Sequence, residues 1–440
     1  MKKNKIGLAL SGGGFRATIY HLGTLRKLRE LGLLDKINVI SSNSGGSITA
    51  ACFSLYYKDF DNFSDIIKNG VRKEITLRIL ISPRFFIPVL LFLAAFTAGY
   101  WSPFQLPPYA YTIIAVISIC ILFRFQFQLI PISKIIEKRY DKVFFKKKKL
   151  KDLSKDFKTT IISTNVETGR LFYFSKQSMS DSTYLHPKAD DPIAPLPGKI
   201  TFKQSDFPIS RAVMASSCVP FAFSPISIGK EFFTNEQDFF KIKPKLVDGG
   251  VYDNQGIHKL TFIKSGTYCE NVIVSDAGNF LPHENWSFNS LFLLTRTSNI
   301  FMSRIKNFQM MANLYTINPN SMVAYQSLAF DLNDSIDEFI KMLKSGYIKD
   351  QVIKAHNIDQ QDIDNKNWEA IKEYLKNKIG YEALEIKGCN ADELKIARKV
   401  RTGLSALSES KINALMKHAE AITELQVKLF LPHLLNQESA

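Results

Sequence analysis

The chain has 440 residues, long enough to bury a large core in one big domain with insertions or in two domains. Its 57 Lys and Arg exceed its 41 Asp and Glu and give a formal charge of +16, so a polyanionic partner is expected, either nucleic acid or an anionic lipid surface. The five cysteines show no pairing or ligand spacing, which excludes a disulfide framework and a structural zinc site and favours a reducing compartment.

The N-terminal stretch predicts a strand, a glycine turn and a helix. Residues 5–11 (KIGLALS) form a short apolar run, too short for a secretory signal, and we interpret it as the first strand. A helix is expected over 15–32, because leucines and an isoleucine recur at helical spacing until Gly32. The turn between strand and helix is Ser11-Gly12-Gly13-Gly14.

A second strand, turn and helix follow at once. Residues 36–42 (KINVISS) predict the strand, and a helix is expected from Gly45 to Tyr57. The turn, Ser42-Asn43-Ser44-Gly45-Gly46, again consists of small residues. Two such turns in tandem predict that backbone amides and a hydroxyl are brought to one place.

A long apolar segment follows. No charged residue occurs in the 39 residues from Phe85 to Phe123, about twice the length of one membrane-spanning helix. Pro103, Pro107 and Pro108 predict a turn in the middle, and hence a helical hairpin with two spans of about 17 and 15 residues. A hairpin buried in a soluble core, or lying in the interface without crossing, is the alternative.

Basic residues flank the hairpin on both outer sides. They include Arg72, Arg78 and Arg84 before it and the lysine-rich stretch 134–151 after it, whereas the tip carries no charge. The positive-inside rule therefore predicts a membrane protein whose remaining chain is on the cytoplasmic side. We expect the 134–151 cluster to meet anionic lipid head groups rather than nucleic acid, since no nucleic-acid motif accompanies it.

The rest of the chain alternates strands and helices. Further strands are expected at 158–166, 170–175, 243–250 and 271–278, and a long surface loop at about 178–208. Such alternation predicts a mostly parallel sheet with helices on both faces. From about residue 286 to the end the pattern is helical.

The second turn has the features of a nucleophile elbow. Ser44 stands between a strand and a helix, as the serine of G-x-S-x-G does, although Ser42 replaces the first glycine. A hydroxyl on such a turn projects outward, but serine-rich turns are also common without any catalytic role. Ser47 is a rival hydroxyl, which we expect inside the helix.

The glycine turn has two interpretations. The sequence from Gly12 to Ala17 satisfies the dinucleotide-binding fingerprint, but the second strand ends without the acidic residue that would hold a ribose. The other interpretation is an oxyanion hole, in which one amide donor is worth about 10²–10³-fold in rate.

A serine nucleophile needs a base, and none of the seven histidines has a recognisable catalytic context. His21 falls on the first helix and is expected to be a packing or surface residue. A carboxylate serves equally well when it lies within hydrogen-bond reach. Asp248, in "VDGG", ends a predicted strand, although such Asp-Gly turns are frequent without function.

Together, Gly-Gly-Gly-x-Arg, the Ser44 turn and Asp-Gly-Gly resemble the patatin-like phospholipase family of the bacterial type. The stretches 162–175, 209–226 and 247–256 are also similar to it. The resemblance implies a three-layer α/β fold, a Ser44–Asp248 dyad and no metal or cofactor. It further implies an oxyanion hole of Gly12, Gly13 and Gly14, supported by Arg16, with Gly46, Gly249 and Gly250 as supporting glycines. Ser42 and Ala17 replace family glycines.

We therefore expect a discontinuous catalytic domain at 1–80 and 131–300, an inserted membrane hairpin at 81–130 and a helical C-terminal region at 300–440. The expected function is hydrolysis of lipid carboxylic esters through an acyl-enzyme, with membrane lipids as both substrate and surface. The alternative is a catalytically degenerate, membrane-bound scaffold of the same fold. Head-group preference and oligomeric state are left open by the sequence.

Overall fold

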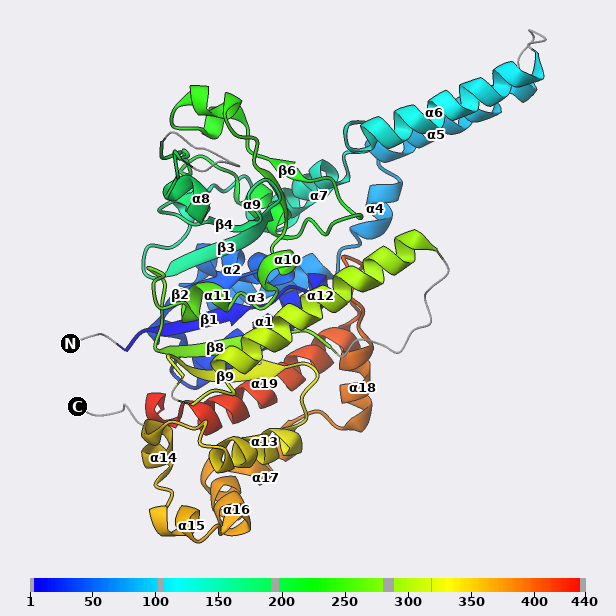
Figure 1. Ribbon diagram of the computed structural model, residues 1–440. Helices are drawn as coiled ribbons and strands as arrows, with labels where there is room; N and C mark the ends of the chain where they lie inside the picture. The colour runs from blue at the N-terminus through cyan, green and yellow to red at the C-terminus, as the bar shows by residue number, and fades with distance from the viewer. Residues whose placement is uncertain (1–3, 102–106, 191–197, 280–288, 318, 436–440) are drawn as a thin grey trace.

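A single mixed β-sheet forms the centre of the molecule (Figure 1). The computed structural model describes residues 4–101, 107–190, 198–279, 289–317 and 319–435. The strands run in the order β5-β4-β3-β2-β1-β8-β9, with β7 paired to β3 and β6 to β7. Their bounds are β1 (Ile6–Leu10), β2 (Ile37–Ser42), β3 (Lys158–Asn165), β4 (Arg170–Phe174), β5 (Met179–Ser180), β6 (Ile226–Ser227), β7 (Lys245–Asp248), β8 (Asn271–Asp276) and β9 (Met322–Ser327).

Strands β3, β2, β1, β8 and β9 lie next to one another in this order and pair in parallel. Strands β4, β5, β6 and β7 add antiparallel pairs beyond β3. Every residue of β1, β8 and β9 is buried. Parallel strands covered on both faces are apolar along their whole length, which explains the continuous run of β1. The predicted α/β fold with a mostly parallel sheet is confirmed.

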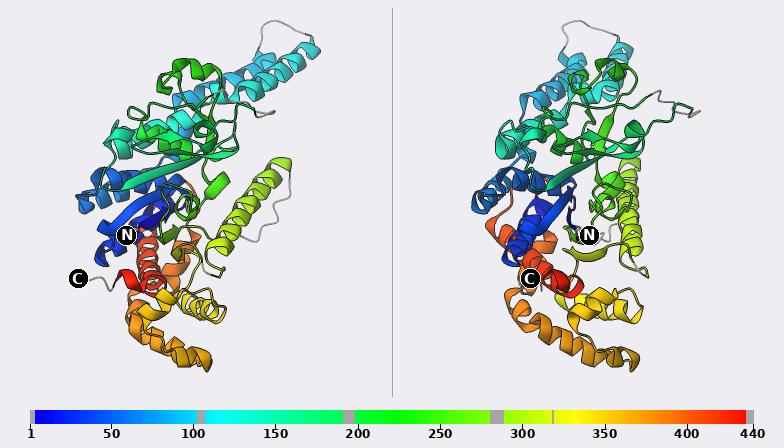
Figure 2. Two further views of the ribbon diagram at one scale, coloured as in Figure 1. Left: turned by 60° about the vertical axis from the view of Figure 1, so that its left-hand side comes forward. Right: turned by 90° about the vertical axis from the view of Figure 1, so that its left-hand side faces the viewer.

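Helices cover both faces of the sheet. In Figures 1 and 2, α1, α2, α3 and α19 lie on one face, and α10, α11 and α12 lie on the other. The bounds are α1 (Gly14–Glu30), α2 (Ser44–Tyr56), α3 (Phe60–Val71), α4 (Thr76–Leu80), α5 (Pro83–Trp101), α6 (Pro108–Leu129), α7 (Ile132–Tyr140), α8 (Ser182–Leu185), α9 (Ile209–Ser216), α10 (Gly250–Asp253), α11 (His258–Thr261), α12 (Ser290–Asn313), α13 (Leu332–Lys344), α14 (Asp350–His356), α15 (Gln360–Asp364), α16 (Trp368–Ile379), α17 (Tyr381–Lys387), α18 (Ala391–Lys399) and α19 (Glu409–Phe430).

The C-terminal region is part of the core. No strand is expected after residue 286, yet β9 lies there and pairs in parallel with β8. The last helix, α19, packs along α1 so closely that a Cβ at Gly23 would lie 2.6 Å from the carbonyl oxygen of Met416. The C-terminal region therefore supplies an edge strand of the sheet as well as helices.

The predicted hairpin appears as two apolar helices, α5 and α6, which project from the body (Figure 1). Their large apolar side chains are exposed, including Leu91 and Ile117. Pro107 and Pro108 stand at the start of α6, as expected for a turn, whereas Pro103 lies outside the described residues. The expected loop at 178–208 contains β5 and α8, and its residues 191–197 also lie outside.

Candidate active site

The register of β3 brings the ends of β2 and β7 together. Ser42, the last residue of β2, is paired with Ile161, and Asp248, the last residue of β7, is paired with Ser163. Strand β4 pairs with one edge of β3, so β2 and β7 share the opposite edge. On that edge β2 pairs with β3 up to Ser42, and β7 pairs with the residues of β3 that follow. The two strand ends are thus two residues apart along β3, about 7 Å. Two segments distant in the sequence therefore meet.

Ser44 has the strained backbone of a nucleophile elbow. It opens α2 with φ of 46°, in the left-handed region, directly after the extended Asn43. This conformation costs a residue with a side chain about 1–2 kcal/mol, and strain of this kind is characteristic of the strand-to-helix turn that exposes a catalytic serine. The Ser44 N–H donates to Ser216 Oγ at 2.8 Å, which holds the turn in place.

Asp248 is a buried carboxylate with a raised pKa. Its side chain is enclosed, and burial raises its pKa to about 6. Three donors oppose this shift: the Gly250 N–H at 2.7 Å, Asn43 Nδ2 at 3.1 Å and the Ser44 hydroxyl. At neutral pH the carboxylate is therefore mostly ionised, within hydrogen-bond reach of Ser44, and more basic than an exposed aspartate.

Asn43 and Ser216, for which no role is expected from the sequence, connect the groups of this site. Asn43 donates to Asp248 and to Asn254 Oδ1 at 3.2 Å, and its own Oδ1 accepts from Ser216 Oγ at 3.2 Å. Ser216 thus bridges the backbone of Ser44 and the side chain that orients Asp248. Both lie inside motifs already quoted, the Ser44 turn and the stretch 209–226, but only the folded geometry assigns them a role.

The glycine turn lies against the serine turn. Gly13 and Gly14 have φ of 142° and 59°, which side chains rarely adopt, and a Cβ on Gly45 would lie 2.1 Å from the Gly14 carbonyl oxygen. The Gly12 amide, expected to be an oxyanion donor, already donates to Asn254 O at 2.9 Å. Within the described residues, the amides of Gly13 and Gly14 have no acceptor.

Arg16 lies beneath this turn. Its Nη1 donates to the carbonyl oxygen of Val400 at 3.1 Å, and burial lowers its pKa, opposed by the charge of Asp276. The expected support of the glycine turn thus runs through a C-terminal segment. The same segment contributes Gly403, whose carbonyl oxygen accepts the Phe15 N–H at 2.9 Å. No sequence motif marks Gly403.

The three supporting glycines each allow a close approach. A Cβ at Gly46 would lie 2.4 Å from Leu10 O, and one at Gly249 would lie 2.4 Å from Asn43 Oδ1. Gly250 provides the amide that donates to Asp248. Any side chain at Gly46 or Gly249 would therefore push β1 or Asn43 out of place.

Ser42, one of the two departures from the family pattern, is accommodated by hydrogen bonds next to the elbow. Ser42 Oγ donates to Thr160 O on β3 at 3.2 Å and accepts from Ser47 Oγ. Ser47 is fully buried within α2, as expected.

His21 is also buried, between Ser275 Oγ at 2.8 Å and Ser11 O at 2.9 Å, and burial lowers its pKa to about 4. His21 is therefore a neutral packing residue. Among the described residues, no three His, Cys, Asp or Glu side chains gather as a metal site.

The family model of the patatin-like phospholipases matches residues 8–261, more than half of the chain. The chain belongs to the patatin-like phospholipase family. It is accordingly a carboxylic ester hydrolase acting on lipids, and the resemblance seen in the sequence is confirmed. The matched residues contain both Ser44 and Asp248.

Solved structures that match the chain are of low sequence identity. VipD from Legionella pneumophila is 13% identical, with a TM-score of 0.32, over 98% of this chain and 87% of that one. Human GIVD cytosolic phospholipase A2 is 11% identical, with a TM-score of 0.45. The match covers 98% of this chain but only 62% of the phospholipase chain. ExoU from Pseudomonas aeruginosa, solved with SpcU, is 12% identical, with a TM-score of 0.23, over 96% and 70%. No curated protein matches the chain.

Proposed function

We propose that this patatin-like protein is a membrane-attached serine hydrolase that cleaves lipid carboxylic esters with Ser44 as nucleophile and Asp248 as base. The observation that carries the proposal is the contact of the Ser44 hydroxyl, on a strained elbow, with a buried carboxylate of raised pKa. A raised pKa brings a base nearer to the pH at which it works, which favours proton transfer.

The reaction proceeds in two halves. Asp248 takes the Ser44 proton as Oγ attacks the ester carbonyl carbon, and the protonated carboxyl then gives that proton to the leaving alcohol. The acyl group remains on Ser44. In the second half Asp248 takes a proton from water, whose oxygen attacks the acyl carbonyl, and the proton returns to Ser44 as the fatty acid leaves.

Backbone amides stabilise the charge on the carbonyl oxygen in both halves. The candidates are Gly13 and Gly14, whose amides have no acceptor among the described residues, and Gly45, the residue after the nucleophile. Gly12 has a structural role in this proposal, because its amide is already occupied by Asn254. Peptide dipoles fixed in this way lose no free energy to reorganisation during the reaction.

The hairpin attaches the enzyme to its substrate membrane. Within the described residues, one helical stretch, Tyr109–Phe145, is long and apolar enough to cross a membrane by length and composition, and its apolar part is α6. The 22 residues of α6 and the 19 of α5 span about 33 and 28 Å, close to the hydrocarbon thickness. The basic flanks support a catalytic domain on the cytoplasmic side, where the exposed lysines of 134–151 would face anionic head groups.

A fluorophosphonate probe tests the nucleophile. The purified protein in detergent should be labelled and should release fatty acid from phospholipid, whereas Ser44→Ala should do neither. Ser47→Ala is the matched control for labelling, because this hydroxyl lies three residues away but is buried in α2, where it contacts Ser216 Oγ at 3.0 Å. Asp248→Asn preserves the shape of the side chain and removes the base, so hydrolysis should fall by about 10³-fold or more.

Absence of both labelling and hydrolysis in the wild type would favour the alternative, a catalytically inactive membrane scaffold. Labelling that persists in Ser44→Ala would instead show that another hydroxyl is the nucleophile. Either result would overturn the Ser44–Asp248 assignment.

A further inference from the structure

The helix α12 exposes its apolar side. Leu293, Ile300, Phe301, Phe308 and Met311 fall along one side of the helix by their spacing, and each is between 48% and 68% exposed. Every described side chain of α12 is at least partly exposed. A helix on the surface of a soluble protein normally turns such residues toward the core.

The opposite side of α12 is polar and faces the protein. Lys306 Nζ lies 2.6 Å from Asp276 Oδ2, and the Gln309 side chain hydrogen-bonds to Asp253. Both carboxylates are completely buried. The helix is therefore held to the body through charged and polar groups, so its exposed apolar side is a fixed orientation and not the result of loose packing.

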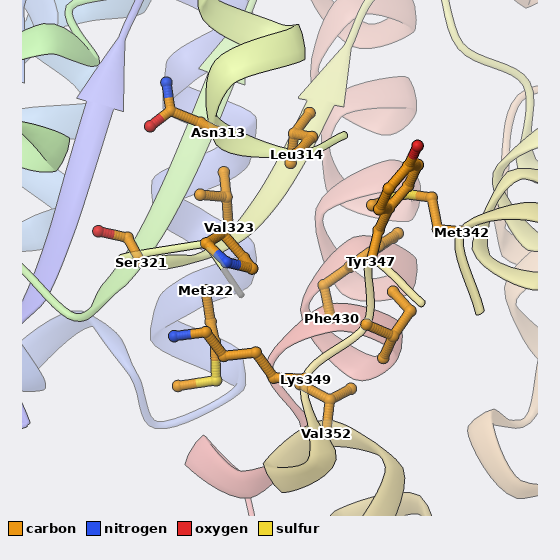
Figure 3. A pocket seen from close by; sticks show the side chains of 12 residues that line it. Asn313, Leu314, Ser321, Met322, Val323, Met342, Tyr347, Lys349, Val352 and Phe430 are labelled. Carbon is orange, nitrogen blue, oxygen red and sulfur yellow. The ribbon is translucent and has the colours of Figure 1, made fainter. Parts of the chain in front are cut away.

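Packing at the C-terminal end of α12 fixes its position further. Leu314, directly after the helix, is buried and lines a pocket with Val323 of β9 and Phe430 of α19 (Figure 3). Three attachments, at Lys306, Gln309 and Leu314, thus anchor the second half of the helix. Its N-terminal half extends away from them along the body (Figure 1).

The charge pattern of this segment suits a lipid surface. The sequence has no Asp or Glu between Glu284 and Asp331, whereas Arg304 is exposed on the apolar side. Carboxylates would repel anionic head groups, and a single arginine among apolar side chains attracts them. Figures 1 and 2 show α12 on the same side of the body as the projecting α5–α6 pair.

We propose that α12 docks onto a phospholipid bilayer containing anionic lipid, with its apolar side in the interface. This inference rests on the membrane attachment proposed above and adds a second contact, on the segment bonded to Asp276 and Asp253. A contact of this kind would orient the catalytic domain toward its substrate surface, whereas a hairpin alone leaves the body free to tilt.

An environment-sensitive fluorophore at position 308 tests the proposal in the full chain. Cys120 and Cys389 are replaced by serine, leaving only the three buried cysteines, and Phe308→Cys is labelled with nitrobenzoxadiazole. The protein is reconstituted in vesicles of phosphatidylcholine and phosphatidylglycerol, without quencher or with lipid that is spin-labelled either at shallow depth, for position 308, or near the end of the acyl chain, for position 117. Ile117→Cys on α6 reports the hairpin, and Ile386→Cys on α17, 83% exposed, is the matched control. Fluorophosphonate labelling of each variant checks the fold and the Ser44 site separately.

We expect a blue-shifted emission and quenching by about twofold or more at 308, where an interfacial helix would lie at the head-group boundary, and none at 386. Quenching at 117 with a water-like signal at 308 would overturn the docking of α12 and leave the hairpin proposal standing. A blue shift at 308 without quenching would show that protein, such as a second copy, covers the helix, and would also overturn it. No quenching at either 117 or 308 would overturn both membrane contacts, and equal quenching at 386 would show that the quenching is unspecific and overturn the docking.

Discussion

The backbone N–H of Phe15 donates to the carbonyl oxygen of Gly403 at 2.9 Å, so a turn close to the C-terminus rests directly on the glycine turn close to the N-terminus. Arg16 strengthens this contact through Val400. The amides proposed to bind the oxyanion are therefore positioned by a segment almost 400 residues further along the chain.

Gly14 should tolerate no side chain. Its φ is 59°, and a Cβ would lie 2.3 Å from Gly403 O. We expect Gly14→Ala to lose more unfolding free energy than the about 1–2 kcal/mol of left-handed backbone alone, with kcat/KM reduced by about 100-fold or more. Thermal unfolding and ester hydrolysis measure both.

Gly32→Ala is the control for this variant. Gly32 has a similar φ of 67°, but no atom lies within 4 Å of its Cβ position. It should lose only the backbone contribution and keep its kcat/KM. Equal losses of activity in the two variants would contradict the proposed contact of Gly14 with the Gly403 segment.

Hydrolysis should depend on an ionised Asp248. Because burial raises its pKa to about 6, activity should fall as the pH drops through 6 and be about tenfold below its plateau at pH 5. The kcat/KM for a soluble short-chain ester, measured from pH 4.5 to 8, gives this curve. A profile that stays flat down to pH 4.5 would exclude Asp248 as the base.

Asn43→Ala should move this acid limb to higher pH. Asn43 Nδ2 donates to the Asp248 carboxylate at 3.1 Å and so lowers its pKa, and a hydrogen bond to a charged group is worth about 1.5–3 kcal/mol. Its loss should raise the inflection by about one to two pH units. An inflection that does not move would show that Asn43 acts only through packing.

Ser216→Ala should disturb the elbow without touching the nucleophile. The variant loses the acceptor for the Ser44 N–H and the donor to Asn43 Oδ1. We expect kcat to fall by about 30-fold while KM changes little, since two buried hydrogen bonds of about 1 kcal/mol each are lost. The neighbouring Ser217→Ala, whose hydroxyl donates to Val213 O, should leave kcat close to the wild-type value.

Lys306→Met should strongly destabilise the fold. Burial raises the pKa of Asp276, but the charge and hydrogen bond of Lys306, together with hydrogen bonds from Tyr325 and Gly278, outweigh it, so the pKa lies below its usual range. Without Lys306 the buried carboxylate keeps its hydrogen bonds from Tyr325 and Gly278 but loses its ion-pair partner, and breaking a buried pair costs about 3–5 kcal/mol. Denaturant unfolding should show this loss and a partial recovery in Lys306→Met combined with Asp276→Asn. A single variant as stable as the wild type would show that Lys306 contributes nothing to the docking of α12.

Local patterns in the sequence predict much of the fold. The helical spacing up to Gly32 and the strand runs before Ser11, Asn43 and Gly249 correspond to elements of the structure, because their apolar residues repeat with the period of each element. The Asp-Gly-Gly turn also indicates a strand end, which is where Asp248 lies.

These local patterns do not predict which strands pair when they are distant in the sequence. The strand β9 is short and lies in a mostly helical region, so its six residues alone do not predict that it pairs with β8. The antiparallel placement of β7 beside β3, which brings Asp248 to Ser44, follows from register and not from composition. The contacts of Asn43, Ser216 and Gly403 are with residues distant in sequence, so the sequence alone does not predict these contacts.

The parallel edge strand and the long final helix also bear on what could be isolated. A fragment cut at residue 261 would keep the nucleophile and the carboxylate, but it would strip β8, β9 and α19 from the apolar faces that they cover. Phe15 would lose its carbonyl acceptor, and α1 would meet water along the side now packed on Met416. A fragment that keeps all of these contacts therefore has to extend to the end of α19, well beyond the part of the chain that carries the two proposed catalytic residues.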